Sequence, residues 1–275
     1  MSSRSLLLSF LASAFLAVSA AADRLIVSGQ DGFLYQADTA TGVFEPFSGP
    51  CVSPLVRMAA DDQHVYGTDA FGTVMVFDRA SGAALNWLFP AVGTINSLAA
   101  GDEGLFVGTV EGDVVRLDPL TGAALQTRTT PDGVRVLLAH EGQLYVASTN
   151  GAIYRAAADG GEFEYFSCFC FFNLSMLAID AGQLVAADEF GTVVRIDLAT
   201  GALLTGFSLF GSRVAGVSDG VLLLYYDGGV IPFANARTGA LLPGQFQAPG
   251  TVSSLFVLHV PAGPRARSRG GLKLP

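Results

Sequence analysis

The sequence predicts an all-β protein, a six-bladed β-propeller with four-stranded blades. Three observations lead to this fold class: one turn motif recurs six times, each repeat contains several short strand-like stretches, and one strand is left over near the C-terminal end. A ring in which the last strand completes the first blade accounts for all three. A linear β-solenoid is the alternative, but its repeats are shorter and it leaves the last strand unexplained.

The repeated motif is a turn in which an Asp-x-x stretch is followed by a small residue and a glycine. Two copies, at residues 114–127 and 193–206, read VVRLDPLTGAALQT and VVRIDLATGALLTG. The motif glycines are Gly42, Gly82, Gly122, Gly161, Gly201 and Gly239. Their successive separations of 40, 40, 39, 40 and 38 residues are typical of propeller blades.

The third repeat, residues 104–127, shows the order of strands and turns most clearly. LFVGT is an alternating strand, VEGD is a tight turn that needs a positive φ at Gly112, and VVRLD is the next strand. In the turn before the strand AALQT, we expect Asp118 to accept backbone hydrogen bonds and Gly122 to be left-handed. Other repeats place Asp38, Asp78, Asp197 and Asn235 at the Asp118 position. The fourth repeat has Ala156 or Ala157 there, which predicts a looser turn.

A further, innermost strand precedes each repeat except the first. These strands are predicted at residues 54–60, 95–100, 134–139, 174–179 and 213–218. Residues 251–260 read as a strand that no repeat follows, so we expect a closing strand from Val252 to Val260 to pair with residues 25–28. Ring closure then leaves only short, protected sheet edges.

Both ends of the sequence differ in composition from the repeats. Residues 1–22 contain Arg4, an apolar stretch too short to cross a bilayer and a run of small residues, which together are typical of a cleaved signal peptide. We therefore expect a secreted or periplasmic protein with no membrane span in its mature chain, and a propeller over residues 23–260. Residues 261–275 are basic, rich in Gly and Pro, and predicted to be a disordered tail.

The charge of the predicted propeller limits its partners. The whole chain has a formal net charge of −9, but residues 23–260 hold ten arginines against 24 Asp and Glu, which gives −14. Such a body repels nucleic acid and anionic lipid. The expected partner is a protein or a small anionic ligand, the latter because of the inner-strand arginines described below. The propeller itself is expected to be a monomer.

The repeats resemble those of the quinoprotein-dehydrogenase-like β-propeller superfamily, the PQQ-like and WD-repeat-like propellers. The stretches LFVGTVEGDVVRLDPLTGAAL (105–125) and VYGTDAFGTVMVFDRASGAALNW (65–87) carry the likeness, which extends over residues 24–260. It implies the fold and leaves the activity open. Two departures are six repeats in place of seven or eight, and a blade-edge tryptophan that appears only as Trp87, with Phe47 and Phe166 as substitutes.

The resemblance also suggests a cofactor, which the residues do not support. Members that bind pyrroloquinoline quinone hold it between a tryptophan and a disulfide of adjacent cysteines, with calcium on carboxylates. In this chain Trp87 belongs to an outer strand, and Phe169 separates Cys168 from Cys170. We predict no cofactor.

The three cysteines are an odd number for an exported protein. Cys51 and Cys168 precede the innermost strands of opposite blades, so a bridge between them is geometrically demanding. A Cys168–Cys170 pair and three free thiols are the other possibilities. The aromatic stretch around them, residues 165–174, is interpreted as a plug between blades, with an exposed contact patch as the alternative.

Arginines at the starts of innermost strands are the candidate ligand-binding residues. Arg57, Arg135 and Arg213 begin these strands in blades two, four and six. Asn96, Asn173 and Ser253 lie at comparable places in blades three, five and one. Three guanidiniums around one channel mouth would bind a multivalent anion or a partner's carboxylates. The favoured alternative is that each arginine pairs sideways with a carboxylate between blades, such as Asp61 or Asp62.

Other polar residues are given structural roles. Arg116, Arg155 and Arg195 share one position in the third strands of successive blades, which favours pairing within the scaffold. The acidic residues Asp31, Asp69, Glu111, Asp188, Glu189 and Asp227 fall in turns that use Asp for backbone reasons, and no calcium loop is formed. His64, His140 and His259 are expected on the opposite face, and no metal or catalytic set is predicted.

Two functional hypotheses follow from these patterns. The preferred one is a non-enzymatic binding or scaffold module that uses the channel-mouth face, because the loops are short and uniform. The alternative is a six-bladed propeller enzyme of the hydrolase, lyase or lactonase type with its active site at the same mouth. Carboxylates that converge at the mouth would favour the enzyme.

Overall fold

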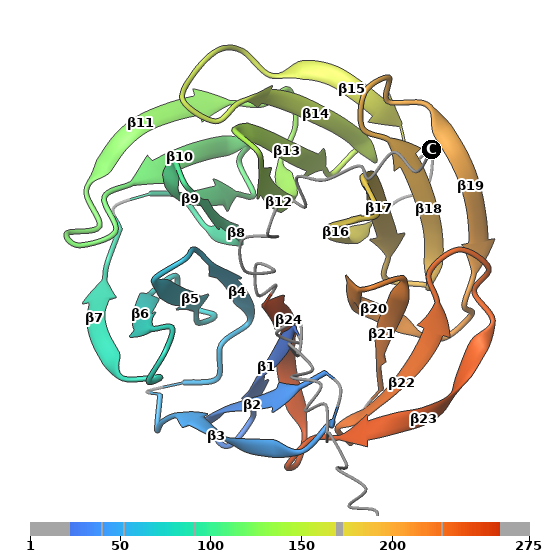
Figure 1. Cartoon of the computed structure of the whole chain (residues 1–275). Coiled ribbons are helices and arrows are strands. Elements are labelled where there is room, and N and C mark those ends of the chain that lie inside the picture. Colours follow the sequence, from blue (N-terminus) through green and yellow to red (C-terminus); the bar gives the residue numbers. More distant parts are fainter. Residues whose placement is uncertain are drawn as a thin grey trace, which may run out of the picture.

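The computed structural model describes residues 23–39, 41–51, 53–90, 92–168, 173–226 and 228–258. These residues form six four-stranded antiparallel sheets around a central axis (Figure 1). The predicted six-bladed propeller is therefore confirmed. The predicted signal peptide, residues 1–22, and the predicted tail, residues 261–275, lie outside the described residues.

The four strands of each blade follow one another from the axis outwards. Blade one contains β24 (Val252–Leu258), β1 (Arg24–Gly29), β2 (Leu34–Asp38) and β3 (Phe44–Ser48); blade two contains β4 (Arg57–Ala60), β5 (His64–Thr68), β6 (Val74–Asp78) and β7 (Ala84–Leu88). Blade three contains β8 (Ile95–Gly101), β9 (Gly104–Thr109), β10 (Asp113–Leu117) and β11 (Ala124–Thr129); blade four contains β12 (Val134–His140), β13 (Gln143–Ser148), β14 (Ala152–Ala157) and β15 (Glu164–Cys168). Blade five contains β16 (Leu174–Asp180), β17 (Gln183–Asp188), β18 (Thr192–Asp197) and β19 (Leu203–Ser208); blade six contains β20 (Arg213–Ser218), β21 (Val221–Tyr225), β22 (Val230–Asn235) and β23 (Leu241–Gln247).

The ring closes through the pairing of β24 with β1. The register places Arg24 opposite Leu258 and Ser28 opposite Ser254, as the surplus strand predicted. The described strand runs to Leu258, and the last two residues of the predicted closing strand, 259 and 260, lie outside the described residues. The Ser254 hydroxyl also donates to the carbonyl of Leu55 at 2.8 Å, which ties the closing strand to blade two.

The hydrophobic core lies between neighbouring blades. One cluster, for example, joins Tyr145 of blade four to Leu177 and Leu184 of blade five. Strands in the second position are buried almost throughout, as in β9, whereas outer strands such as β7 are mostly exposed. Because a second-position strand is covered on both sheet faces, Leu105, Phe106 and Val107 of β9 are all buried. The alternation predicted for LFVGT is therefore wrong.

The repeated turn has the predicted conformation. Gly112 and Gly122 have φ values of 103° and 73°. Asp118 Oδ1 accepts hydrogen bonds from the amides of Leu120 and Thr121 at 2.8 and 2.9 Å. Asn235 makes the equivalent bonds in blade six, with the amides of Arg237 and Thr238 at 2.9 and 3.0 Å. An amide oxygen therefore serves in this turn as well as a carboxylate oxygen does.

The turn of blade four is held from outside. Strand pairing opposite Gln143 shows that Ala157 occupies the aspartate position. Arg128 of β11 donates from Nη1 to the carbonyls of Ala157 and Gly160 at 2.8 and 3.2 Å. A guanidinium from the preceding blade thus holds this turn through its carbonyls, whereas the aspartate of other blades accepts from the amides.

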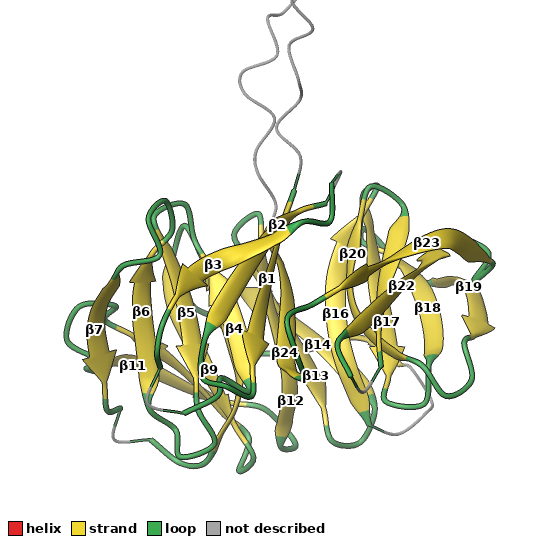
Figure 2. Ribbon diagram, turned by 90° about the horizontal axis from the view of Figure 1, so that it is seen from below, coloured by secondary structure: helices red, strands yellow, loops and turns green. Residues whose placement is uncertain are grey.

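The strands run between two faces of the ring (Figure 2). We call one the mouth face: it carries the starts of the innermost strands and the turns between second and third strands. Thr94 and Val110 show this proximity, because the Val110 amide donates to the Thr94 carbonyl at 3.0 Å. The opposite side is the termini face, where Asp23 and Leu258 lie at the two ends of the described chain.

Candidate binding face at the channel mouth

β-Bulges occur in the innermost strands at the opening of the channel. The register slips by one residue at Asn96 in β8 and at Arg135 in β12. The same slip occurs at Ser253 in β24. A bulge leaves one residue outside the ladder and re-aims its side chain. Three of the six candidate residues therefore lie at bulges.

Blade five differs from this pattern. Its bulged residue is Ser175, because Leu174 pairs with Asp188 and Met176 with Ala187. Asn173 precedes the strand with a φ of 69°, and its carbonyl accepts the amide of Glu189 at 3.2 Å. Asn173 is thus a residue of the linker and lies one position before β16.

Arg57 and Asn96 belong to a series of hydrogen bonds around the opening of the channel. Arg57 Nε donates to the Asn96 carbonyl at 2.8 Å, and Nη1 donates to the Val56 carbonyl at 2.8 Å. The Asn96 amide group donates to the Val134 carbonyl at 2.9 Å. These bonds connect the innermost strands of blades two, three and four. The acceptors are neutral, so they leave the charge of Arg57 uncompensated.

Arg135 is the arginine of this set that meets a carboxylate. Its Nη2 lies 3.6 Å from Glu189 Oε1 in blade five, and both side chains are partly exposed. The partners suggested from sequence, Asp61 and Asp62, are elsewhere: they lie at the start of β5 on the termini face. The pKa of Arg57 is lowered, first by burial and second by the positive charge of Arg135.

Arg213 is exposed at the start of β20, paired in the ladder with Tyr225. Within the part of the chain that the structure describes, no side chain pairs with its guanidinium. Ser253 is partly exposed on the neighbouring β24. The structure thus links Arg57 and Asn96 by hydrogen bonds that extend to Val134, next to Arg135, whereas Arg213 makes no bond to them within the described chain.

Two buried carboxylates of the mouth face, Asp69 and Asp188, hold the backbone of their own turns. Asp69 is buried and accepts the amides of Phe71 and Thr73, both at 2.9 Å. Asp188 is also buried and accepts the amides of Phe190 and Thr192. Asp227 lies outside the described residues. Among the described residues, no three His, Cys, Asp or Glu side chains are grouped to hold a metal ion.

Exposed phenylalanines gather on the mouth face. Phe71 is 87% exposed and Phe210 is 90% exposed. The exposed phenylalanines of the described chain are Phe33, Phe71, Phe89, Phe190 and Phe210, and all five follow strands at their mouth-face ends. Val110 and Tyr226 add to this surface. We call these seven residues the aromatic rim.

The aromatic rim has two pairs of phenylalanines in opposite blades. In blade five, Phe190 and Phe210 flank a backbone hydrogen bond of 2.7 Å from the Leu209 amide to the Gly191 carbonyl. In blade two, Phe71 and Phe89 lie at the same end of the paired strands β6 and β7. Blades two and five are three positions apart in a six-membered ring. The pairs therefore lie on opposite sides of the mouth.

Sequence reasoning missed the aromatic rim. A signal was present, because the stretches DAFGTV (69–74) and DEFGTV (188–193) repeat a phenylalanine at the tip of a turn. A turn tip is a surface position, and a large apolar side chain there has no neighbours in its own sheet. Polar side chains are the usual candidates for a binding site, so a search for them passes over apolar residues in turns.

The second arginine set is structural, as predicted. Arg195 is buried and forms a 2.9 Å ion pair with buried Asp180, and it donates to the Ala236 carbonyl of blade six at 3.1 Å. Arg155 donates to the Leu198 carbonyl at 3.3 Å. Arg116 differs, because its buried Nε has no hydrogen-bond partner in the described chain.

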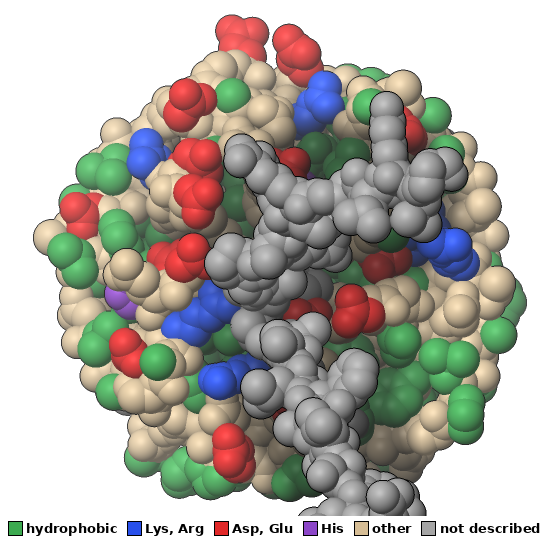
Figure 3. Space-filling model, in the orientation of Figure 1, with side chains coloured by type: hydrophobic (Ala, Val, Ile, Leu, Met, Phe, Trp, Pro, Cys, Tyr) green, Lys and Arg blue, Asp and Glu red, His purple; other side chains and the backbone are tan. Residues whose placement is uncertain are grey.

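The termini face is rich in carboxylates. Figure 3 shows this face, with Asp and Glu side chains (red) spread around the ring. His64 and His140 lie here at strand ends, as expected, whereas His259 lies outside the described residues. Asp61 accepts the Tyr66 hydroxyl at 2.6 Å, and Arg79 lies 3.8 Å from Asp62. These contacts stay within blade two and form part of the scaffold.

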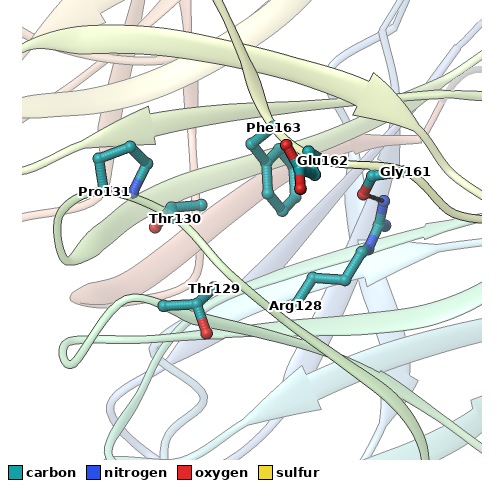
Figure 4. Close-up of a pocket in the computed structure, with 7 residues that line it drawn as sticks. All are labelled: Arg128, Thr129, Thr130, Pro131, Gly161, Glu162 and Phe163. Atoms are coloured by element: carbon teal, nitrogen blue, oxygen red, sulfur yellow. Dashed lines mark hydrogen bonds between the residues drawn. The ribbon is translucent and has the colours of Figure 1, made fainter.

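An open groove between blades three and four has a volume of about 480 Å³ (Figure 4). Its cation, Arg128, lies 4.9 Å from the ring centre of Phe163 and bonds the carbonyls of the blade-four turn. Because the guanidinium is already used by these carbonyls, the groove offers a ligand little charge. It belongs to the packing between blades.

Cys51 is a free, half-buried thiol. Burial raises its pKa to about 11, so it stays protonated and unreactive near neutral pH. The side chain of Cys168, and Cys170 entirely, lie outside the described residues. A pairing between these two stays a prediction from sequence.

Comparisons with known proteins identify the fold. No family model matches the sequence, and no curated protein matches it. The crystal structure of the computationally designed Ika8 protein is 18% identical and matches 86% of this chain and 68% of its own, with a TM-score of 0.51. The structure of U3-55K is 13% identical and matches 83% of this chain and 80% of its own, with a TM-score of 0.61. At these identities the likeness establishes the propeller fold alone.

The described residues contain no helix with the length and apolar character that crossing a bilayer demands.

Proposed function

We propose that this protein is an exported, non-enzymatic binding module that holds a protein partner on its mouth face. The observation that carries this proposal is the aromatic rim: all five exposed phenylalanines of the described chain lie on one face. Clustered exposed apolar side chains mark interaction sites more often than scattered ones do. Aromatic residues and arginine also dominate the binding energy of protein interfaces.

The propeller supports this role mechanically. The phenylalanines project from turns whose backbone is fixed by buried carboxylates such as Asp188 and by glycines such as Gly191. A Cβ at Gly191 would clash with the Leu209 carbonyl, so the turn and the linker pack directly on each other. Binding then requires little ordering of the surface, which lowers its entropic cost.

A matched pair of variants tests the proposal. Phe71→Ser combined with Phe210→Ser removes exposed rings from both sides of the mouth, and Leu120→Ser combined with Leu203→Ser removes exposed apolar side chains elsewhere. All four residues are exposed, so both variants should fold like the parent protein. Affinity capture from the source cell's exported proteins, followed by mass spectrometry, should yield a partner with the parent and the leucine variant.

The phenylalanine variant should lose that partner. The affinity of the purified partner, measured by biolayer interferometry, should fall at least tenfold, because an interface aromatic contributes about 2 kcal/mol or more. Equal capture by all three proteins would contradict the proposal. A partner lost only by the leucine variant would also contradict it, since binding would then use the outer surface.

A further inference from the structure

Three arginines lie close to the channel on the mouth face, and they make few contacts with described carboxylates. Arg57, Arg135 and Arg213 lie on innermost strands, and the described chain brings one carboxylate, Glu189, to one of them. That contact is 3.6 Å long and partly exposed, so it compensates little. The body as a whole is strongly acidic, so three arginines near one channel opening stand out from their surroundings.

Three carboxylates of the mouth face are held within their own turns. Asp31 accepts the Phe33 amide at 3.0 Å and the Tyr35 hydroxyl at 2.6 Å. Asp69 and Asp188 are buried in their turns and face backbone amides. They cannot swing towards the arginines without breaking the turns that position the aromatic rim.

The arginines keep free hydrogen-bonding capacity. A guanidinium has five N–H donors, and Arg57 uses two in bonds of 2.8 Å to carbonyls and one in a long contact of 3.4 Å to Asn96. Arg213 is exposed, and all its donors face solvent or remain unpaired within the described chain. Carboxylates are the best acceptors for these unused guanidinium donors, because one carboxylate accepts two parallel hydrogen bonds.

Resting on the proposed function, we propose that the centre of the mouth face is a socket for carboxylates of the partner. The partner is then a protein whose docking segment carries acidic side chains between apolar ones. Its apolar residues contact the aromatic rim, and its carboxylates meet Arg57, Arg135 and Arg213. This arrangement gives a role to arginines that keep unused donors beside the channel of an acidic molecule.

Citrate is a suitable probe of the socket because it presents three carboxylates. We expect the parent protein to bind citrate at low ionic strength in isothermal titration calorimetry. Arg213→Gln should weaken binding several-fold, and the triple Arg57/Arg135/Arg213→Gln variant should weaken it at least tenfold. Arg237→Gln makes the same change of charge on an exposed arginine of the termini face and should bind citrate like the parent.

Arg213→Gln keeps the test decisive if the triple variant fails to fold, because Arg213 makes no side-chain pair in the described chain. Unchanged citrate affinity in Arg213→Gln would overturn the socket. An equal loss in Arg237→Gln would overturn it too, since the effect would then reflect net charge alone. Failure of the parent to bind citrate at low ionic strength would have the same consequence.

Binding measurements with the captured partner distinguish the socket from the proposed function. If the socket is correct, Arg213→Gln and Phe210→Ser each weaken the captured partner, and the parent's affinity falls as salt rises. Loss of binding in Phe210→Ser but not in Arg213→Gln overturns the socket and leaves the binding function intact. Loss in neither variant overturns both.

Discussion

At the scale of single residues, one arginine position is used in two different ways in blades three and five. Arg195 is buried with Asp180, and its other donors reach Gln183 and the carbonyl of Ala236. Arg116 occupies the same strand position, but its Nε is buried without a partner in the described chain. The carbonyl that corresponds to Ala236 is Ala158, and Arg128 Nη2 contacts it at 3.4 Å. Arg128 has therefore displaced Arg116 from its expected acceptor.

Replacing these two arginines should give opposite results. Arg195→Met leaves the buried Asp180 carboxylate unpaired, so the free energy of unfolding should fall by about 3–5 kcal/mol. Arg116→Met removes a buried, unsatisfied donor, so the free energy of unfolding should change by less than about 1 kcal/mol. Urea unfolding followed by circular dichroism measures both. Similar losses in the two variants would show that Arg116 has a compensating contact.

The repeated turns make stability depend on acid. Hydrogen bonds lower the pKa of three partly exposed carboxyl groups: in Asp118 the main donor is the Thr121 amide, and in Asp78 and Asp197 it is a hydroxyl, of Ser81 and Thr200. A lowered pKa means that folding favours the ionised form. This stabilisation is complete above the unfolded-state pKa of about 3.9 and is lost as the pH falls through the lower folded-state values.

The triple variant Asp78/Asp118/Asp197→Asn tests this dependence. Asn235 shows that an amide oxygen can accept the turn hydrogen bonds, so the variant should remain folded at pH 7. Its urea midpoint should fall less than that of the parent between pH 7 and about pH 3, because these positions no longer titrate. An equal fall in both proteins would assign the acid sensitivity to other carboxylates.

Residue roles were predictable where a repeat fixed the local backbone. Asp118 and Gly122 were assigned correctly because six copies of one turn reveal what each position requires. Arg135 and Asn96 were placed near the rim, but their bulges were not predicted, because an extra unpaired residue leaves no periodic signal. Ion pairs such as Arg135–Glu189 join different blades, and no local pattern specifies them.

At the scale of elements, the turn of blade four depends on the blade before it. Arg128 bonds the carbonyls of Ala157, Ala158, Gly160 and Gly161, at distances from 2.8 to 3.4 Å. The sequence predicted a looser turn here, because Ala157 has no side-chain acceptor. The structure shows that a neighbour supplies donors to the carbonyls, which is a different solution from an aspartate that accepts from the amides.

Arg128→Met should loosen this turn locally. Amide hydrogen exchange over residues 158–163 should accelerate, while the equivalent turn at residues 118–122 should be unchanged. Ala157→Asp introduces the acceptor that Asp118 and Asp197 provide in their turns, so it should slow exchange again in the Arg128→Met background. No change in exchange for Arg128→Met would show that the turn is held by its own backbone bonds.

At the scale of the whole molecule, the closing strand makes the ring continuous. Val257 of β24 is buried in a cluster with Leu25 of blade one and Leu223 of blade six. It also lies against Gly216, where an added Cβ would come within 2.6 Å of its side chain. The seam between the first and last blades is therefore packed as tightly as an interior contact.

Val257→Asp should destabilise the whole ring. A buried, unpaired carboxylate costs several kcal/mol, so the urea midpoint should fall markedly. Trp87 is the single tryptophan and lies in blade two, away from the seam between blades one and six. Its fluorescence and the far-ultraviolet circular dichroism should shift together if the ring unfolds as one unit. An unchanged Trp87 transition would show that blades unfold separately.

The architecture was predictable at this scale because it follows from the number of repeats and strands in the sequence. Six turn motifs and one strand without a repeat admit one closed arrangement, and β24 pairs with β1 as that arrangement requires. The position of the mouth face was predictable, but its exposed phenylalanines were not. Its phenylalanines resemble core residues in sequence, and only the fold shows that Phe71 and Phe210 are uncovered.

The pairing of Arg24 with Leu258 has a practical consequence for handling the molecule. Both ends of the described chain leave from the side opposite the aromatic rim. A tag, carrier or solid support joined at either end would therefore hold the molecule in one orientation, with the rim turned outwards. Sensor surfaces that carry the molecule attached by one end or by the other should present the same face to a partner. Binding measured on the two surfaces should therefore be directly comparable.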